Sequence, residues 1–396
     1  MNTCNCRLAS RRSFAEAIVP DPLASGSLAA EAAPRAGSHL AAIGATGSES
    51  PATWQEVLRQ AVRDVGDLCR RLRLPVESAS AEAAARFPLL LPEPLLRRIQ
   101  PGDPTDPILR QVLPTAAELE AADGFCEDPL AEAKVPGGAG RLDRYQGRSL
   151  IIATGRCGVH CRYCFRRHRM GGDSPDADGA SAQSGAPPSP HATAPPSRPR
   201  ADEVILSGGD PLTLDDGQLA ALAERIEATD RPRRLRVHTR MPVVIPDRVT
   251  GALVRLLRDA RPTTIVVLQI NHAAELDASV EEAIGRLVDA GIPVLSQSVL
   301  LRGVNDRLDA LAELMEALVD LRVMPYYLHQ LDRVAGAAHF EVPTAEGRRL
   351  MARMRERLPG YAVPRYVRQL PDTPAKQPLD TPATQLPDDV HEAGAR

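Results

Sequence analysis

The chain has 396 residues, of which 43% are hydrophobic and 25% charged, and its formal net charge is −3. This is enough apolar material for one large domain with appendages, and the near-neutral charge argues against a nucleic-acid partner. No apolar run is long enough to span a bilayer, the N-terminus lacks the apolar core of a signal peptide, and seven cysteines give no disulfide framework, so we expect a cytoplasmic protein without a membrane partner.

The N-terminal part of the chain divides into two regions. Residues 1–50 are rich in Ala, Gly, Ser and Pro, which predicts a disordered extension in which Cys4 and Cys6 are incidental. A helical module is expected over residues 51–143, with helical periodicity between 53 and 74 and a Pro- and Asp-rich passage after it.

After Tyr145 the sequence alternates between β-branched apolar runs and helical patterns. Such alternation predicts parallel βα units with right-handed crossovers, and six units form a partial (β/α)6 barrel, similar to a TIM barrel, over residues 144–360. Catalytic groups are then expected at the carboxyl ends of the strands. Strands are predicted at 149–154, 203–207, 235–238, 264–270, 292–296 and 323–329, and helices at 216–228, 247–259, 276–290, 308–321 and 344–358.

Two further segments lack the pattern of a packed structure. Residues 171–200 are rich in Pro, Ser, Ala and Gly and are predicted to form a disordered insertion in the barrel. Residues 361–396 form a C-terminal segment whose tail we also predict to be disordered.

Three cysteines follow the first barrel strand in the pattern Cys157-x3-Cys161-x2-Cys164. Iron–sulfur clusters are normally held by four thiolates, so three thiolates suit a cluster with one iron open to a small molecule. Structural zinc prefers four ligands, and His160 or His168 could complete such a set. The loop by itself leaves both kinds of site open.

Residues beside and beyond the cysteine loop favour an iron–sulfur cluster over zinc. Tyr163 precedes the third cysteine, and Ser207-Gly-Gly-Asp-Pro211 ends the next predicted strand. Together these features resemble the radical S-adenosylmethionine enzymes. The resemblance implies a [4Fe–4S] cluster on Cys157, Cys161 and Cys164 whose open iron binds the amino and carboxylate groups of S-adenosylmethionine.

Lysine is almost absent from the chain. Only Lys134 and Lys376 are lysines among the 48 basic residues. A covalently bound pyridoxal phosphate needs a lysine amine, and arginine cannot replace it because the guanidinium stays protonated. If the protein uses this cofactor, one of the two lysines must hold it, while an ordinary surface lysine is the alternative for each.

Several motifs between residues 85 and 380 together resemble the lysine 2,3-aminomutase family, especially the branch that makes β-lysine for modification of elongation factor P. The resemblance excludes the insertion. The motifs that carry it are Arg144-Tyr-Gln-Gly-Arg148, the cysteine loop with Phe165-Arg-Arg-His168, Leu206-Ser-Gly-Gly-Asp-Pro-Leu212, Ile270-Asn-His272, Ser296-Gln-Ser-Val-Leu-Leu-Arg-Gly-Val-Asn-Asp306, Val323-Met-Pro-Tyr-Tyr-Leu-His329, Gly336-Ala-Ala-His-Phe340 and Pro374-Ala-Lys-Gln-Pro-Leu-Asp380.

The resemblance implies specific residues for pyridoxal 5′-phosphate. Lys376 matches the lysine that forms the Schiff base with this cofactor, whereas Lys134 lies in a variable segment. Arg144, Tyr145 and Arg148 match a motif that contacts the cofactor, and arginines suit its phosphate because they form charge-assisted hydrogen bonds.

The resemblance also implies how lysine is held. Arg166 matches the guanidinium that binds the substrate α-carboxylate, with a solvated basic face as the alternative for this Arg-Arg-His run. Asp332 matches a carboxylate that pairs with the ε-ammonium group. The catabolic enzymes carry a second acid seven residues before the Schiff-base lysine, where this chain has Gln369, and Asp372 is a candidate to compensate.

A last group of residues is expected around S-adenosylmethionine. Small residues at the glycine-rich strand end permit close backbone approach to the methionine amino group. Gln269 stands where many relatives carry histidine, and ordinary strand-end hydrogen bonding is the alternative for Asn271 and Gln297. The predicted contacts are Tyr163, Ser207, Gly208, Gly209, Asp210, Gln269, Asn271 and Gln297.

The family mechanism requires these parts together. An electron donor such as flavodoxin or ferredoxin reduces the cluster, S-adenosylmethionine is cleaved to a 5′-deoxyadenosyl radical, and the amino group of lysine migrates from the α to the β carbon. The resemblance further implies a functional link to a lysyl-tRNA-synthetase-like ligase and to elongation factor P. Two alternatives stay open: a catabolic or biosynthetic aminomutase for lysine or another amino acid such as glutamate, and a non-catalytic metal-binding module.

Overall fold

A computed structural model describes residues 53–136, 140–169, 201–371 and 373–380. These residues belong to one compact unit that begins at Pro51. The predictions for residues 1–50, for the insertion at 171–200 and for the tail after residue 380 lie outside the described residues, as do those for Cys4, Cys6 and Asp372.

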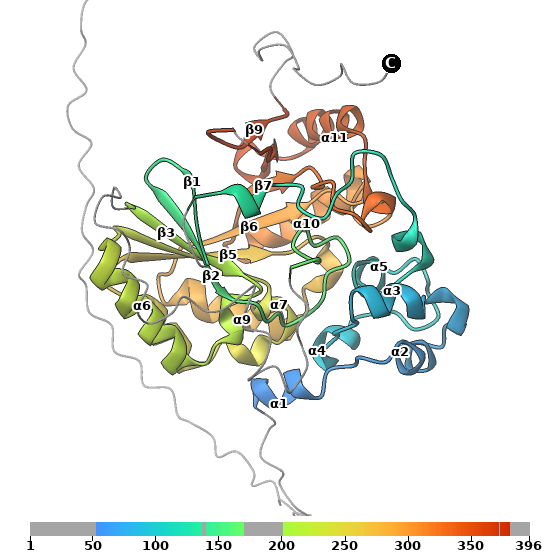
Figure 1. The fold of residues 1–396 in the computed structure, drawn as a ribbon, viewed down its shortest axis with the longest axis horizontal. Helices are drawn as coiled ribbons and strands as arrows, with labels where there is room; N and C mark the ends of the chain where they lie inside the picture. The colour runs from blue at the N-terminus through green and yellow to red at the C-terminus, as the bar shows by residue number, and fades with distance from the viewer. Residues whose placement is uncertain (1–52, 137–139, 170–200, 372, 381–396) are drawn as a thin grey trace, which may run out of the picture. The chain divides into compact units, whose positions relative to one another are not determined.

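A single nine-stranded sheet forms the framework, and its strand order follows the chain from β1 to β9 (Figure 1). Strands β2 to β8 are parallel, β1 pairs antiparallel with β2, and β9 pairs antiparallel with β8. The strands are β1 (Arg141–Tyr145), β2 (Arg148–Thr154), β3 (Glu203–Gly208), β4 (Arg234–Thr239), β5 (Thr263–Gln269), β6 (Val294–Val299), β7 (Met324–His329), β8 (Arg365–Arg368) and β9 (Gln377–Pro378). The predicted partial barrel is confirmed, with β2 to β7 as its six strands.

The central strands are apolar on both faces, as parallel strands covered by helices must be. In β5, for example, Val266, Val267 and Leu268 are consecutive and fully buried. Three strands escaped prediction because their local signal is weak. Strand β1 (Arg-Leu-Asp-Arg-Tyr) is only half-buried along its length, β8 has four residues, and β9 has two.

Helices connect the parallel strands close to the predicted positions. Helix α8 begins at Gly251 rather than at 247, because Pro246–Arg248 forms a 3-10 turn and the Thr250 hydroxyl caps the helix by accepting from the Leu253 N–H at 3.1 Å. The helices of this region are α6 (Asp216–Asp230), α7 (Met241–Val244), α8 (Gly251–Arg258), α9 (Ala278–Asp289), α10 (Leu308–Asp320) and α11 (Thr344–Arg357).

The expected N-terminal helical module consists of short helices that gather at one side of the sheet (Figure 1). The helical pattern between residues 53 and 74 is divided into two helices, since Val62 forms a bridge with Leu91 between them. The helices are α1 (Trp54–Arg59), α2 (Val65–Arg71), α3 (Ala81–Arg86), α4 (Glu93–Leu96) and α5 (Pro107–Val112).

The module and the barrel share one hydrophobic core. Leu68 and Leu109 of the module belong to the same buried cluster as Val204 and Leu268 of the barrel. Strand β1 also crosses the domain boundary predicted between residues 143 and 144. The division into 51–143, 144–360 and 361–396 stays a prediction.

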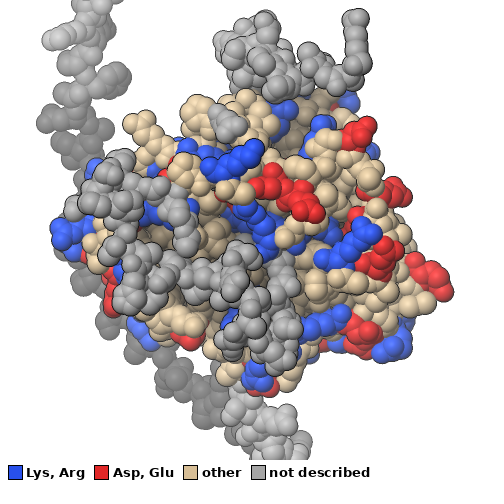
Figure 2. Space-filling view, viewed as in Figure 1, with Lys and Arg blue, Asp and Glu red and all other residues tan. Residues whose placement is uncertain are grey.

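The surface seen in Figure 2 carries charges of both signs. Basic and acidic side chains are interspersed on the face seen in Figure 2. No helix of the described part of the chain is both long enough and apolar enough to cross a membrane.

Candidate active site

A cavity lies at the carboxyl ends of the parallel strands, where the topology brings together residues from distant parts of the chain. Most of the predicted site residues line it. They are Cys157, Cys161, Tyr163, Cys164, Arg166, Ser207, Gly208, Gly209, Asp210, Gln269, Gln297, Asp332 and Lys376. The cysteine loop and the candidate cofactor lysine therefore face one common space.

The N-terminal module holds the cysteine loop in place. The Arg162 N–H donates to the Gln111 carbonyl at 2.9 Å, and the His160 N–H donates to the Leu90 carbonyl at 3.2 Å. The fully buried Arg162 guanidinium forms two hydrogen bonds with Glu118, at 2.8 and 2.6 Å. The backbone between the second and third cysteines is thus anchored to residues more than forty positions earlier.

The two histidines proposed as a fourth zinc ligand have other roles. The His160 ring stacks on Phe87 with centroids 4.9 Å apart, and its Nδ1 lies 2.9 Å from the Pro88 carbonyl. His168 Nε2 lies 3.0 Å from the Ala335 carbonyl. Within the described residues no set of three His, Cys, Asp or Glu side chains converges to bind a single metal ion.

The three thiols nevertheless fit a cluster. All three are half-buried, and all three line the cavity. Thiolates that hold a [4Fe–4S] cluster bind different irons, so they surround a volume and need not converge on one point. The donor set therefore fits a cluster better than a zinc ion.

The glycine-rich end of β3 packs directly against the backbone of the cysteine loop. A Cβ atom on Gly209 would lie 2.0 Å from the Arg156 carbonyl oxygen, and one on Gly208 would lie 2.6 Å from the Thr154 carbonyl oxygen. Gly208 also has a φ of +118°, which side chains of other residues disfavour. Only glycine permits this approach of β3 to the loop.

Asp210 is part of the framework of the site. Its carboxylate accepts hydrogen bonds from the N–H groups of Leu212, Arg240 and Met241 and from the Thr239 hydroxyl, at 2.6–3.1 Å. Burial raises the pKa of this carboxyl, and these hydrogen bonds counter the effect. Asp210 therefore joins the ends of β3 and β4. Because it also lines the cavity, its direct contact with a cofactor stays a prediction.

Asn271 is fully buried and does not line the cavity. Its amide donates to the Tyr163 hydroxyl at 2.6 Å and to Gln111 Oε1 at 2.8 Å, and its Oδ1 accepts from the Val299 N–H at 2.8 Å. Asn271 thus makes the strand-end hydrogen bonds considered above as the alternative, and its contact with S-adenosylmethionine stays a prediction.

Arg166 is buried, with 5% of its surface exposed, so the solvated basic face is wrong for this residue. Its Nε and Nη2 donate to the two carboxylate oxygens of Glu132 at 2.9 and 2.8 Å. Its Nη1 donates to the Ser207 hydroxyl at 3.1 Å and to the Gly208 carbonyl at 3.2 Å. Glu132 thus fixes the plane of the guanidinium at the edge of the cavity.

Lys376 lies where β8 and β9 close the C-terminal side of the sheet. Its Nζ donates to Gln369 Oε1 at 3.0 Å and lies 5.5 Å from the centre of the Tyr327 ring. Burial lowers the pKa of Lys376 to about 8, with further lowering by nearby arginines, although Asp332 opposes the shift. Gln369 therefore contacts the lysine itself, a role that its position in the motif did not suggest.

The residues around Lys376 are electrostatically linked to it. Burial raises the pKa of Asp332 to about 7, and the positive charge of Lys376 partly offsets this effect. Burial also lowers the pKa of His238 and His329 well below the usual value for histidine, and Lys376 adds to the effect on both. Both imidazoles are therefore neutral at physiological pH.

The residues of the pyridoxal-phosphate motif do not line the main cavity, but the charges of Arg144 and Arg148 both lower the pKa of Lys376. The guanidinium of Arg148 lies 5.1 Å from the centre of the Tyr145 ring. Arg144 Nη1 and the Tyr145 hydroxyl are buried and have no hydrogen-bond partner within the described residues. Unpaired buried donors are costly, and a phosphate would satisfy them, so these residues fit the group.

Several residues of the site escaped sequence reasoning. Gln111 and Glu132 lie outside every quoted motif, and Glu275 lies three residues after the Ile270-Asn-His272 motif. Their roles in the site become visible only in the folded chain. Arg240 and His238 lie at the end of β4, and their position after a barrel strand is a signal that could have identified them.

A parallel barrel whose cavity joins a three-cysteine loop to a glycine-lined strand end defines an enzyme of the radical S-adenosylmethionine class. Comparisons with known proteins narrow this class. The chain is 41% identical to L-lysine 2,3-aminomutase of Escherichia coli over 83% of its own length and 94% of that protein. It is 37% identical to the Haemophilus influenzae protein of the same name, over 82% of this chain and 94% of the relative. The Clostridium subterminale protein is 34% identical, over 82% of this chain and 77% of the relative.

The chain therefore belongs to the L-lysine 2,3-aminomutase family. It is an isomerase whose cofactors are a [4Fe–4S] cluster, S-adenosylmethionine and pyridoxal phosphate. No family model matches the sequence.

Solved structures that are similar in fold include the following two. Streptococcus suis SuiB bound to precursor peptide SuiA has a TM-score of 0.36 and 14% identity, over 55% of this chain and 46% of that one. Native anSMEcpe with bound AdoMet and a peptide has a TM-score of 0.35 and 12% identity, over 52% of this chain and 58% of that one. At this level of similarity neither informs the reaction.

Proposed function

We propose that the cavity converts L-α-lysine to β-lysine by moving the amino group from the α to the β carbon. The observation that carries this proposal is that one cavity holds the three thiols and Lys376 together with Arg166 and Asp332. A guanidinium and a carboxylate in one cavity match the α-carboxylate and the ε-ammonium group of lysine.

The chain has residues that can bind each of the three cofactors. When bound, the cluster and S-adenosylmethionine supply a radical that abstracts hydrogen, and pyridoxal phosphate supplies a ring that delocalises the unpaired electron. We assign the cluster to the cysteine loop, the methionine part of S-adenosylmethionine to residues 207–209, and its nucleoside to Gln269 and Gln297. The phosphate is assigned to Arg144, Tyr145 and Arg148, and the covalent attachment to Lys376.

The protein's own contribution to the reaction is to orient the substrate and exclude water. Arg166 is held rigidly by Glu132 and Ser207, so a carboxylate bound to it has a defined direction. Such positioning lowers the entropic cost of bringing one particular hydrogen atom to the reacting centre.

Lys376 is prepared for covalent attachment by its environment. Its pKa of about 8 leaves roughly a tenth of the amine neutral at pH 7, far more than for an exposed lysine. The neutral amine is the nucleophile that attacks an aldehyde. His238 and His329 are neutral, so neither imidazole adds a positive charge beside this amine.

Asp332 favours lysine over glutamate as the substrate. An ammonium group brought beside this carboxyl stabilises its ionised form and pairs with it. The distal carboxylate of glutamate would instead face a second acid, and Glu132 in the same cavity adds to the repulsion. Lysine is therefore the substrate we propose, even though Gln369 replaces the second acid of the catabolic enzymes.

We further propose that the β-lysine is used to modify elongation factor P, through a lysyl-tRNA-synthetase-like ligase. The support is the resemblance of the motifs to that branch of the family, including the Lys376 motif with Gln369 before it. An electron donor such as flavodoxin or ferredoxin and a reducing cytoplasm complete the proposal. The free thiols of Cys69 and Cys126, outside the loop, are consistent with such a compartment.

The scarcity of lysine makes the proposal simple to test. Protein reconstituted without oxygen with iron, sulfide and pyridoxal phosphate is incubated with lysine, S-adenosylmethionine and dithionite, and β-lysine is measured by mass spectrometry. Borohydride reduction followed by peptide mapping should place the pyridoxyl group on Lys376, and Lys376→Arg should remove it, whereas Lys134→Arg should not. A pyridoxyl group on Lys134, or the absence of iron–sulfur absorption, would refute the assigned site.

The pathway needs a separate experiment. Elongation factor P is incubated with the ligase, ATP and the reaction mixture of this enzyme, and its mass is measured. An increase of one lysyl residue that depends on this enzyme supports the proposal. No dependence on the enzyme would leave the aminomutase activity standing and refute the link to elongation factor P.

A further inference from the structure

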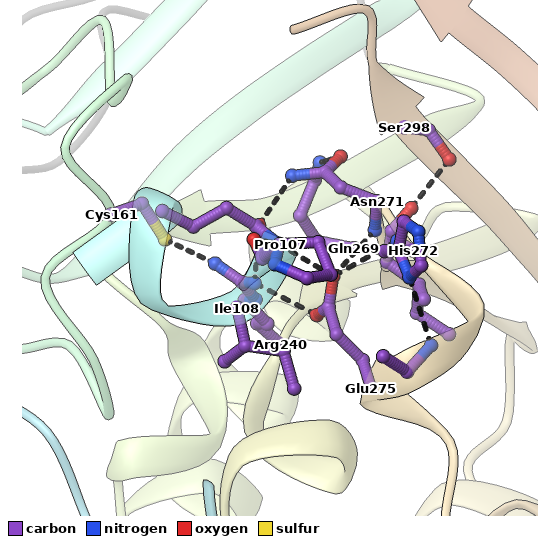
Figure 3. A network of polar contacts seen from close by, with 12 residues as sticks. Pro107, Ile108, Cys161, Arg240, Gln269, Asn271, His272, Glu275 and Ser298 are labelled. Carbon is purple, nitrogen blue, oxygen red and sulfur yellow. Dashed lines mark hydrogen bonds and ion pairs between the residues drawn. The ribbon is translucent and has the colours of Figure 1, made fainter. Parts of the chain in front are cut away.

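An arginine that follows β4 contacts the cysteine loop directly (Figure 3). The Nη1 of Arg240 lies 2.7 Å from the Cys161 Sγ and 3.0 Å from the Tyr163 hydroxyl. Its Nη2 donates to Gln111 Oε1 at 2.7 Å and to Glu275 Oε2 at 2.8 Å. One guanidinium thus joins a proposed cluster ligand to a buried carboxylate.

The position of this guanidinium is determined from every side. Asp210 accepts from the backbone N–H of Arg240 at 2.6 Å, which fixes where the side chain begins. Glu275 is fully buried, and its Oε1 accepts from the Asn271 N–H at 2.9 Å and from the Gln111 amide at 3.1 Å. The Arg240 side chain has only 6% of its surface exposed. Neither charge can move to solvent.

We infer that Arg240 is a positioning residue that sets the reduction potential of the cluster through its hydrogen bond to Cys161. The inference rests on the proposed assignment of the cluster to the cysteine loop. Reduction adds one electron, supplied by an external reductant, to the cluster and its thiolates. A buried cation that donates to a ligand sulfur stabilises this additional negative charge, because such hydrogen bonds tune clusters and are strong at low dielectric.

Glu275 acts in the opposite direction. Its carboxylate neutralises the Arg240 charge and adds a negative charge to the same network. Removing the Arg240 guanidinium should therefore make the cluster harder to reduce, and removing the Glu275 charge should make it easier to reduce. General loosening of the site would not produce two shifts of opposite sign.

The test is a redox titration of the reconstituted protein with dithionite, followed by electron paramagnetic resonance of the reduced cluster. At the midpoint potential of the unsubstituted protein, Arg240→Met should lower the ratio of reduced to oxidised cluster by about tenfold, which is about 59 mV for one electron. Arg240→Lys should also lower it, because one ammonium cannot reach Cys161, Gln111 and Glu275 together. Glu275→Gln, of nearly the same shape, should raise the ratio.

Arg248→Met provides the matched control. Arg248 is another fully buried arginine, but it bonds to the Leu212 and Leu214 carbonyls and to Asp216 and not to the cysteine loop. Its replacement should leave the potential unchanged. If Arg240→Met fails to take up a cluster, Arg240→Lys and Glu275→Gln still test whether the two shifts in reduction potential have opposite signs.

The outcomes separate this inference from the proposed function. A cluster with equal potentials in all variants, or with shifts of the same sign for Arg240 and Glu275, would overturn the role of Arg240 and leave the cluster assignment intact. Failure of the unsubstituted protein to take up any cluster would overturn both.

Discussion

Replacing Glu118 by glutamine should expose how strongly the cysteine loop depends on one buried ion pair. The Glu118 side chain is 1% exposed and pairs with Arg162 at 2.6 Å and also with Arg167. Glutamine has the same shape but no charge, so both guanidiniums would stay buried without a counter-ion. Breaking a buried pair on one side costs about 3–5 kcal/mol.

This cost can be converted into a melting temperature. With roughly 290 described residues and about 2.1 cal/mol/K of unfolding entropy per residue, the transition has an entropy of about 0.6 kcal/mol/K. The Glu118→Gln protein without cofactors should then melt about 5 to 8 °C lower in differential scanning calorimetry. It should also take up less iron and sulfide, because Arg162 lies between Cys161 and Cys164.

Glu82→Gln is the control, since it removes a carboxylate of the same module from an ion pair with Arg86 at 2.7 Å. Both of these side chains are more than 60% exposed, so the expected cost is at most about 1 kcal/mol, or less than about 2 °C. If the two substitutions lowered the melting temperature equally, burial would not be what makes the Glu118 pair important, and the reasoning would be wrong.

Four further outcomes are expected. In nuclear magnetic resonance of protein labelled with ¹³C-lysine, one of the two lysine signals should titrate near pH 8 and should be absent from Lys376→Arg. In Asp332→Asn the same signal should titrate at a lower pH, because the carboxylate no longer raises the pKa of the amine. A titration at pH 10 or above would contradict the burial of this amine. Because unfolded lysine keeps its proton up to about pH 10.5, stability should rise between pH 8 and 10.5, and Lys376→Met should flatten that rise in urea unfolding. Asp332→Asn should raise the KM for lysine about 10- to 100-fold in the β-lysine assay, with a smaller change in kcat, and an unchanged KM would remove Asp332 from ammonium binding. Gly209→Ala should lower the free energy of unfolding by about 1–3 kcal/mol or more. Gly155→Ala should lower it by about 0.5 kcal/mol or less, because nothing lies within 4 Å of the new Cβ. Equal losses would contradict the packing of Gly209 against Arg156.

Much of the fold was predictable because its signals are local. Strands β2, β3 and β5 contain apolar runs, and helical patterns alternate with the strands, so both the barrel and its active edge followed from the sequence. Strands β1, β8 and β9 could not be predicted in this way, since their residues become strands only by pairing with a sheet that already exists.

The same division holds in the active site. The cysteine spacing, the glycine pair at the end of β3 and the isolation of Lys376 are properties of a few adjacent residues or of composition, so they could be predicted without the fold. Asn271 shows the limit: its place at the end of a strand was correct, but its side chain is used inside the protein and not in the cavity.

Which charges meet depends on how distant segments of the chain pack together. Glu132 holds Arg166 from 34 residues away, and Gln111 and Glu275 hold Arg240 from 129 and 35 residues away. No local pattern encodes such pairs, because their stability comes from burial, and burial is set by how the N-terminal module packs on the barrel. The sequence thus determined which groups can do chemistry here, and the packing of distant segments determined their orientation and their charge.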